Sequence, residues 1–330
     1  MTTDRPDISL IVPFHNAETT IERTLRSIDA QTHKSVERIF VNDGSTDRSY
    51  EIVKQYIKNN PSTSGRSILI HTKQQGLANA NMTGLNHSTG RYVVRCDADD
   101  YMEPDALESM LAVADRDHCD VVISAYYNDT PRGSKIVGFG KKRPASLNDF
   151  AINTLHFSLC NKLISLDLLR FNNISPFPYI DPWEDLGVVS RAVALSSRIG
   201  IVDRPLYHYI TDPSRRSLSR SSRDRLLEDH LRMALLIEQW FLDHAITDKY
   251  AEFLNHLKFC AKVKMMRGRI KDADRWKRTF PEVNCRILRL RHIPLRYRLL
   301  FKAVAILPAR FTQWVADLVA KTYSEEDVEK

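Results

Sequence analysis

The sequence predicts an α/β protein with a mostly parallel sheet covered by helices, followed by a helical region at the carboxyl end. Three observations support this fold class. Short apolar runs alternate with segments of helical spacing through residues 8–210, which is typical of parallel, helix-covered sheets. Three of these runs end abruptly in polar residues, and open α/β sheets bind ligands at the carboxyl ends of their strands. From residue 225 onward the apolar residues recur mostly at helical spacing.

The first part of the predicted sheet is built from three strands. Residues 8–12 read as a buried strand that Pro13 ends, because proline cannot donate to the ladder of a central strand. The next two strands each follow a segment of helical spacing and a turn. In order, we expect a strand at 8–12, a helix at 17–30, a strand at 36–41, a helix at 50–57 and a strand at 67–71.

The second part begins with small residues at helical spacing, Ala80 and Gly84 among them, which favour a helix packed closely on the sheet. A fourth strand and further alternation follow. In order, we expect a helix at 76–90, a strand at 92–96, a helix through 107–114, a strand at 121–126, a hairpin or loop at 128–144, helical spacing over 147–170, a helix at 186–195, and strands at 199–202 and 206–210.

Composition and charge restrict the class of protein. The chain is 43% hydrophobic and 27% charged, as ordinary globular proteins are. No uninterrupted apolar stretch reaches about 18 residues, which excludes an ordinary spanning helix. The polar, acidic residues 1–7 predict no signal peptide. The five cysteines are scattered and odd in number, which indicates free thiols in a reducing compartment. We therefore predict a cytoplasmic protein.

Three carboxylates directly follow the predicted strand at 92–96: Asp97, Asp99 and Asp100. Like charges this close repel one another unless water or a cation compensates them. Hard oxygen ligands suit Mg²⁺ or Mn²⁺. The alternative is a solvated acidic turn before a helix, where carboxylates are also favourable.

Polar groups also follow the first two strands, at residues 13–18 and 42–47. If the strands are parallel, all three clusters lie along one edge and form one cleft. There Asp43 could accept the N3 hydrogen of a uracil, Asp97 could reach a ribose hydroxyl, and Asp99 could hold a cation on a diphosphate. Glu184 and Asp185 are candidates for a base, although both could simply be acids at the start of a helix.

Taken together, these motifs resemble the family 2 glycosyltransferases of the GT-A fold, particularly bacterial enzymes that build surface polysaccharides. The resemblance covers roughly residues 7–210, and the order and spacing of its motifs match. It rests on Ile11-Val12-Pro13-Phe14-His15-Asn16-Ala17-Glu18, Val41-Asn42-Asp43-Gly44-Ser45-Thr46-Asp47, Gly76-Leu77, Asp97-Ala98-Asp99-Asp100 and Glu184-Asp185.

The resemblance implies a Rossmann-like GT-A domain and an inverting, metal-dependent transfer of a sugar from a nucleotide donor, usually a UDP-sugar, to a hydroxyl acceptor. Asp185 would be the favoured base, with Glu184 as its neighbour or substitute. Asp99, with Asp97, would hold Mn²⁺ or Mg²⁺. The nucleotide would be bound by Pro13, Phe14, His15, Asn16, Glu18, Asp43, Lys73, Gly76, Asp97 and Ala98.

One departure from the family pattern concerns the phosphate side of the site. After Gly76-Leu77 the family usually shows an Ala-Arg-Asn triplet, whereas this chain has Ala80-Asn81-Met82. The missing arginine would have been a bidentate phosphate contact. Lys73 or a residue of the Arg215-Arg216 loop could substitute, or donor affinity could be weaker.

The carboxyl-terminal part is basic, and we predict two domains: residues 1–222 as the glycosyltransferase domain and residues 223–330 as a helical region. Residues 262–310 hold 15 Lys and Arg against 3 Asp and Glu. Their interleaving with apolar residues suits helices that lie in an anionic membrane interface, near lipid-linked acceptors. The predicted location is the cytoplasm, and peripheral attachment to the inner face of the cell membrane is the hypothesis for this tail. The alternative is a solvated basic face on a packed helical region. No recognised nucleic-acid motif accompanies the charges, so no nucleic-acid partner is predicted.

Two alternative functions remain open at this point. A metal-dependent nucleotidyltransferase also uses paired carboxylates, but it would normally need a glycine-rich basic loop near its first strand, and residues 13–18 contain no glycine. A nucleotide-sugar-binding protein without turnover would keep the cleft, and the missing arginine favours that alternative.

Overall fold

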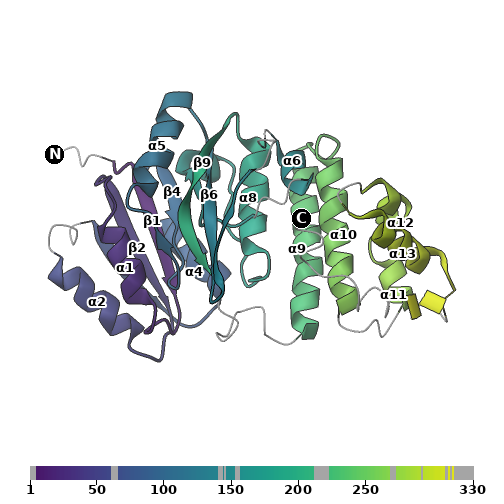
Figure 1. The fold of residues 1–330 in the computed structure, drawn as a ribbon, viewed down its shortest axis with the longest axis horizontal. Coiled ribbons are helices and arrows are strands. Elements are labelled where there is room, and N and C mark those ends of the chain that lie inside the picture. Colours follow the sequence, from purple (N-terminus) through teal and green to yellow (C-terminus); the bar gives the residue numbers. More distant parts are fainter. Residues whose placement is uncertain are drawn as a thin grey trace. The chain divides into compact units, whose positions relative to one another are not determined.

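The computed structural model describes residues 5–60, 66–139, 144, 146–152, 157–211, 223–267, 273–290, 293–308, 311–312 and 314–315. The chain divides into two compact units. The first comprises Met1–Ala145 and Phe157–Arg216, and the second comprises Ser146–His156 and Ser217–Lys330. Figure 1 shows the sheet in purple to teal and the helices of the second unit mainly in green to yellow. A short segment before residue 157 thus belongs with the helices that follow residue 217.

The first unit is built on a nine-stranded mixed sheet in the order β3-β2-β1-β4-β8-β6-β9-β5, with β7 on β6. Strands β3, β2, β1 and β4 run parallel, so their carboxyl ends share one edge. The other half is mixed, since β8 is antiparallel to both neighbours and β9 is parallel to β6. The strands are β1 (Ile8–Phe14), β2 (Val36–Asp43), β3 (Ser67–Thr72), β4 (Tyr92–Arg95), β5 (Tyr101–Met102), β6 (Val121–Thr130), β7 (Gly133–Val137), β8 (Lys162–Ser165) and β9 (Ile199–Ile210).

Helices cover both faces of this sheet (Figure 1). Leu10, Val12 and Phe40 pack with residues of α1, α2 and α5 in one apolar core. On the opposite face α4 lies against Ile11 of β1. The helices of the first unit are α1 (Ile21–Asp29), α2 (Ser49–Asn59), α4 (Leu77–His87), α5 (Ala106–Asp117), α7 (Leu166–Phe171) and α8 (Glu184–Leu195).

Three sequence-based expectations need correction. Pro13 does not end the first strand, because the ladder with β4 stops at the Ile11–Arg95 pair and Pro13 lies beyond it, still paired with β2. The segment 147–170 is not continuously helical, since it contains β8, which inserts between β4 and β6. The two strands expected at 199–210 are one strand, β9, whose register with β6 shifts on either side of Ala125.

The second unit is helical, as expected from the spacing. Its core contains large side chains with almost no exposed surface, such as Phe241, Phe259, Trp276 and Phe301. Its elements are α6 (Leu147–Ile152), α9 (Arg223–Asp243), α10 (Ala251–Arg267), α11 (Ala273–Arg278), α12 (Pro281–Arg286), the 3₁₀ helix η2 (Ile287–Arg289) and α13 (Leu295–Ile306). Within the described residues, no helix combines the length and apolar character that crossing a membrane requires. All five cysteines are free thiols.

The close approach of α4 to the sheet depends on Gly84. A Cβ atom added there would lie 2.4 Å from Cγ2 of Ile11. This methyl group is attached to a β-branched side chain that is only 4% exposed, so it cannot move away easily. Gly84 therefore sets the distance between α4 and β1, as the run of small residues predicted.

We predict that Gly84→Ala lowers the free energy of unfolding by about 1–2 kcal/mol, because overpacking outweighs the gain of about 1 kcal/mol that alanine makes in a helix. Urea unfolding followed by circular dichroism measures this. Gly138→Ala is the matched control, since the nearest atom to a Cβ there is 3.8 Å away. Equal stability of the two variants would show that α4 can shift.

Candidate functional site

The loops after β1 and β2 are joined by hydrogen bonds at the shared edge. The side-chain oxygen of Asn16 accepts from the Thr46 N–H over 2.8 Å. The His15 ring nitrogen Nδ1 lies 2.7 Å from the Asp43 main-chain oxygen. Glu18 accepts from the Arg48 N–H over 3.1 Å. His15, Asn16 and Glu18 are exposed at this edge, whereas Pro13 and Phe14 are buried within β1.

The acidic turn at 97–100 is fixed by α1. Hydroxyl groups at the start of this helix donate to main-chain oxygens of the turn: Thr20, the residue before α1, to Ala98 over 2.8 Å, and Thr24 within α1 to Asp100 over 2.7 Å. The Asp100 carboxylate is 1% exposed and accepts from Tyr207 Oη and from the Ile210 N–H, both over 2.8 Å. Burial raises the pKa of Asp100, and the charges of Asp97 and Asp99 raise it further. Asp100 thus anchors the turn to β9.

Asp43 is oriented by the start of α4. Its two carboxylate oxygens accept from the N–H groups of Gln75 and Gly76 over 2.8 and 2.9 Å, and the side chain is 5% exposed. Gly76 has φ +95°, and a Cβ there would lie 2.5 Å from Oδ2 of Asp181. Asp181 in turn accepts from the Ala78 N–H over 3.0 Å. Two carboxylates therefore bind the amino end of α4, where the helix dipole favours negative charge.

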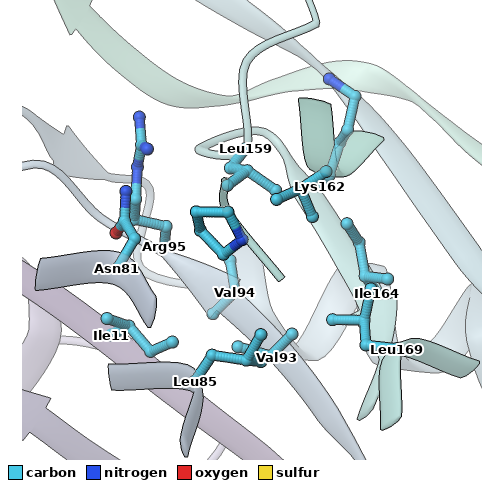
Figure 2. A pocket seen from close by; sticks show the side chains of 12 residues that line it. Ile11, Asn81, Leu85, Val93, Val94, Arg95, Leu159, Lys162, Ile164 and Leu169 are labelled. Carbon is cyan, nitrogen blue, oxygen red and sulfur yellow. The ribbon is translucent and has the colours of Figure 1, made fainter. Parts of the chain in front are cut away.

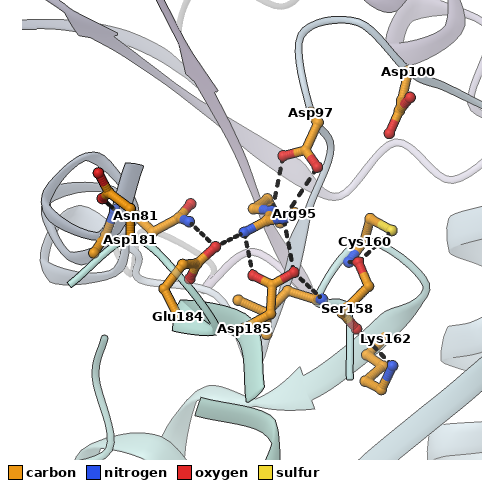
Figure 3. A network of polar contacts seen from close by, with 12 residues as sticks. Asn81, Arg95, Asp97, Asp100, Ser158, Cys160, Lys162, Asp181, Glu184 and Asp185 are labelled. Carbon is orange, nitrogen blue, oxygen red and sulfur yellow. Dashed lines mark hydrogen bonds and ion pairs between the residues drawn. The ribbon is translucent and has the colours of Figure 1, made fainter. Parts of the chain in front are cut away.

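A single buried guanidinium holds three of the carboxylates together (Figure 3). Arg95, the last residue of β4, is 6% exposed. Its Nε and Nη2 lie 2.9 and 3.1 Å from the two oxygens of Asp97. Its Nη1 and Nη2 donate to the two oxygens of Asp185 over 2.5 and 3.0 Å, and Nη1 also contacts Glu184. Glu184, Asp185 and Asp97 therefore all contact the guanidinium of Arg95.

The two candidate bases differ in their pKa. Burial raises the pKa of Glu184 well above its usual range, the charge of Asp185 adds to this, and Arg95 only partly opposes it. Burial would also raise the pKa of Asp185, but Arg95 and hydrogen bonds from Glu184 and the Leu159 N–H outweigh burial and lower it. Burial raises the pKa of Asp97 to about 6. Asp185 is therefore the ionised partner of the neighbouring pair, and Glu184 is the one that holds a proton more readily.

Asn81 reaches the same cluster from α4. Its Nδ2 donates to Oε1 of Glu184 over 3.1 Å, and it is 4% exposed. Beneath Asn81 and Arg95 lies a cavity of about 40 Å³ lined almost entirely by apolar side chains, among them Leu85, Val93 and Val188. Figure 2 shows Asn81 and Arg95 on one side of this cavity and Lys162 on the other, with apolar side chains around the rest of it. In this structure the side chain of Asn81 therefore forms a hydrogen bond with a carboxylate.

A divalent cation fits Asp99 better than Asp97. Both oxygens of Asp97 already contact Arg95. Asp99 is exposed, and the bond it makes within the described part of the chain is to its main-chain oxygen, from Arg23. Among the described residues, no group of three or more His, Cys, Asp or Glu side chains could hold a metal. One carboxylate is nevertheless enough for Mg²⁺ or Mn²⁺ when substrate phosphates and water supply the other ligands.

The structure brings most of the predicted site residues to one edge of the sheet, but it adds two that sequence analysis missed, Arg95 and Asp181. Arg95 ends an otherwise apolar run, Tyr92-Val93-Val94, and a charged residue at that position could have been recognised as a candidate site residue. Asp181 lies in an irregular segment, where no sequence pattern indicated a role for it. Lys73 is exposed in the loop after β3. The Arg215-Arg216 loop lies outside the described residues.

Comparison with known proteins gives consistent matches over this unit. The family model described as Glycosyl transferase family 2 matches residues 9–168. EpsH of Bacillus subtilis is 33% identical over 217 residues, which are 62% of this chain and 61% of EpsH. The glycosyltransferase GlyA of Streptococcus pneumoniae is 37% identical over 121 residues, 37% of this chain and 17% of GlyA. An uncharacterized glycosyltransferase of Haemophilus influenzae is 31% identical over 197 residues, 58% of this chain and 76% of that protein. The chain thus spans less than two thirds of EpsH and GlyA.

Solved structures show the same fold. Residues 1–349 of S. aureus TarS in complex with UDP-GlcNAc match with a TM-score of 0.71 and 22% identity, over 97% of this chain and 92% of that one. The mannosyltransferase PcManGT of Pyrobaculum calidifontis, in complex with GDP-Man and Mn²⁺, matches with a TM-score of 0.52 and 17% identity, over 97% and 88%. These likenesses confirm the expected GT-A architecture.

Proposed function

The chain belongs to glycosyl transferase family 2, and we propose that it transfers a sugar, with inversion, from a UDP-sugar to a hydroxyl group of a glycan or lipid-linked acceptor during polysaccharide synthesis. The observation that carries this proposal is that Asp97, at the edge of the sheet, and Asp185, at the start of α8, both contact Arg95. A carboxylate on the nucleotide side of the site therefore lies close to a candidate base. UDP-GlcNAc in TarS and Mn²⁺ in PcManGT support the choice of donor and metal.

In this proposal the nucleotide lies along the edge formed by β1, β2 and β4. The exposed side chains of His15, Asn16 and Glu18 flank it, together with Pro13, Phe14 and Ala98. Asp43, held by the amides of Gln75 and Gly76, faces the base, and Asp97 faces the ribose. Lys73 is exposed near the same edge and is the candidate partner for the phosphates.

Asp185 takes the proton of the acceptor hydroxyl while the hydroxyl oxygen forms its bond to the anomeric carbon. The bond between that carbon and the diphosphate breaks at the same time, and the electron pair leaves with UDP. Asp185 suits this role because it is ionised, and Glu184 suits it less because its pKa is raised. A divalent cation held by Asp99 would stabilise the negative charge on the leaving diphosphate.

We predict that Asp185→Asn keeps UDP affinity, measured by calorimetry with Mn²⁺, but lowers kcat by about 10³-fold, because it removes the base. Glu184→Gln is the comparison, since it keeps the shape of the neighbouring side chain. A larger kcat loss in Glu184→Gln than in Asp185→Asn would assign the base to Glu184.

A panel of UDP-sugars and other nucleotide sugars, assayed for hydrolysis, identifies the donor. Complete lack of turnover with every nucleotide sugar would favour a binding protein without enzymatic activity.

We predict that Asp99→Ala abolishes the Mn²⁺-dependent part of both UDP binding and turnover, because it removes the exposed carboxylate that fits the cation. Calorimetric titration of UDP with and without Mn²⁺ measures the binding effect. Asp117→Ala, which removes a half-exposed carboxylate at the end of α5, is the control and should behave like wild type. Unchanged metal dependence in Asp99→Ala would remove Asp99 from the metal site.

We further propose that the second unit contacts the anionic inner face of the cell membrane through α13. Leu295, Leu299 and Ile306 are 57%, 54% and 68% exposed. Their spacing places them on one stripe of the helix, opposite the buried side chains of Tyr297 and Phe301. The basic residues Arg296, Arg298 and Lys302 lie beside this stripe. An apolar stripe with basic flanks is what an interfacial helix presents to anionic lipid.

The triple variant Leu295→Gln/Leu299→Gln/Ile306→Gln should lose flotation with vesicles that contain phosphatidylglycerol, because the helix can no longer insert its apolar stripe. Ile136→Gln is the matched control, since Ile136 is 58% exposed on β7 in the other unit. Wild type should float less at high salt because the basic contacts are screened. Equal flotation of triple variant and wild type rejects the contact through α13.

A further inference from the structure

Arg95 joins carboxylates that come from two separate parts of the chain. Asp97 lies two residues after it, and Asp185 begins α8. The Nε–Nη2 edge of the guanidinium faces both oxygens of Asp97, and the Nη1–Nη2 edge faces both oxygens of Asp185 (Figure 3). A rigid planar fork matches the geometry of a carboxylate on each edge. The guanidinium therefore sets both the separation and the relative orientation of Asp97 and Asp185.

The contacts involve all three nitrogens of the guanidinium. Nη1 and Nη2 donate two hydrogen bonds to Asp185, one to Glu184 and one to Asp97. Nε is buried and lies 2.9 Å from Asp97 in an ion pair, but it makes no hydrogen bond within the described residues. The side chain is 6% exposed, so a donor phosphate would find no accessible N–H group on it. Arg95 therefore acts on other side chains of the protein and does not bind the substrate.

Carboxylates surround the nitrogens of this guanidinium. Arg95 also lines one side of the apolar cavity of about 40 Å³, but its guanidinium points away from that cavity (Figure 2). Glu184, which also contacts Arg95, is held from its other side by Asn81. Removing a single partner from such a buried group leaves charge without compensation, and the remaining side chains then rearrange.

We propose that Arg95 is a positioning residue for glycosyl transfer, which holds the donor-side Asp97 and the acceptor-side Asp185 in one rigid frame. The inference rests on the proposed function, because that function supplies the roles of Asp97 and Asp185. Through this frame, the ribose contact and the base keep a fixed distance, so the sugar and the attacking hydroxyl are presented to each other in a constant geometry. Loss of the frame affects the transfer step more than nucleotide binding.

The test compares Arg95→Met with Arg38→Met. Arg38 is also 6% exposed, but it lies on β2, where its charge acts on Tyr56, so its loss reports the effect of removing a buried arginine from the sheet. We expect Arg95→Met to lower kcat by about 100-fold relative to Arg38→Met, with a much smaller change in the KM for the donor. A kcat equal to that of Arg38→Met overturns the proposal.

A second variant covers the case in which Arg95→Met does not fold. Arg95→Lys keeps the positive charge, but a single ammonium group cannot face both oxygens of two carboxylates. We expect Arg95→Lys to fold, to bind UDP with Mn²⁺ like wild type, and to show a lowered kcat. A kcat equal to that of wild type would mean that charge alone is sufficient, and it would overturn the positioning role.

A measurement without substrate separates this inference from the proposed function. Urea unfolding of Arg95→Met, Asp185→Asn and the double variant should show strongly non-additive losses, because the two residues are in contact. If the coupling is present but wild type turns over no nucleotide sugar, the proposed function fails while the frame remains. If wild type is active and the losses are additive, the frame fails while the function remains.

Discussion

Burial of carboxylates at one sheet edge is the constraint on which the rest of the site depends. An ionised carboxyl group that is removed from water needs hydrogen bonds or a cation, or its pKa rises. The fold meets this requirement differently for each group. Asp43 accepts hydrogen bonds from main-chain N–H groups, and Asp100 accepts them from Tyr207 and Ile210. Asp97 and Asp185 are both paired with Arg95. Asp99 is the exposed member of the acidic turn and is therefore the one suited to a ligand from outside.

The edge itself could be predicted from the sequence, because a parallel sheet brings its carboxyl ends together whatever the loops do. Apolar runs followed by Asp43 and by Asp97 were enough to predict one cleft. The position of Glu184 and Asp185 beside Asp97 could be anticipated only through the family resemblance. Nothing local in their segment indicates which strand the start of α8 will face.

The missed features depend on contacts between distant parts of the chain. Arg95 looked like the polar end of a strand, since its partners Glu184 and Asp185 lie about ninety positions further along. The strand β8 was hidden inside a segment of helical spacing, because Leu163 and Ile164 become strand residues only through pairing with β4 and β6. Local spacing cannot carry such information.

The position of the arginine has a consequence for the phosphate side of the site. The Nη1 and Nη2 groups of Arg95 donate to carboxylates, whereas the family resemblance implies that an arginine in place of Asn81 would contact the phosphates. Asn81 instead donates to Glu184. If UDP-sugar is the donor, a cation at Asp99 and the exposed Lys73 are the groups among the described residues of this edge that we propose to balance the negative charge of its diphosphate. In the proposed function, the chain would exchange a direct phosphate contact for a rigid frame around its base, and its activity would depend more strongly on the metal for the same reason.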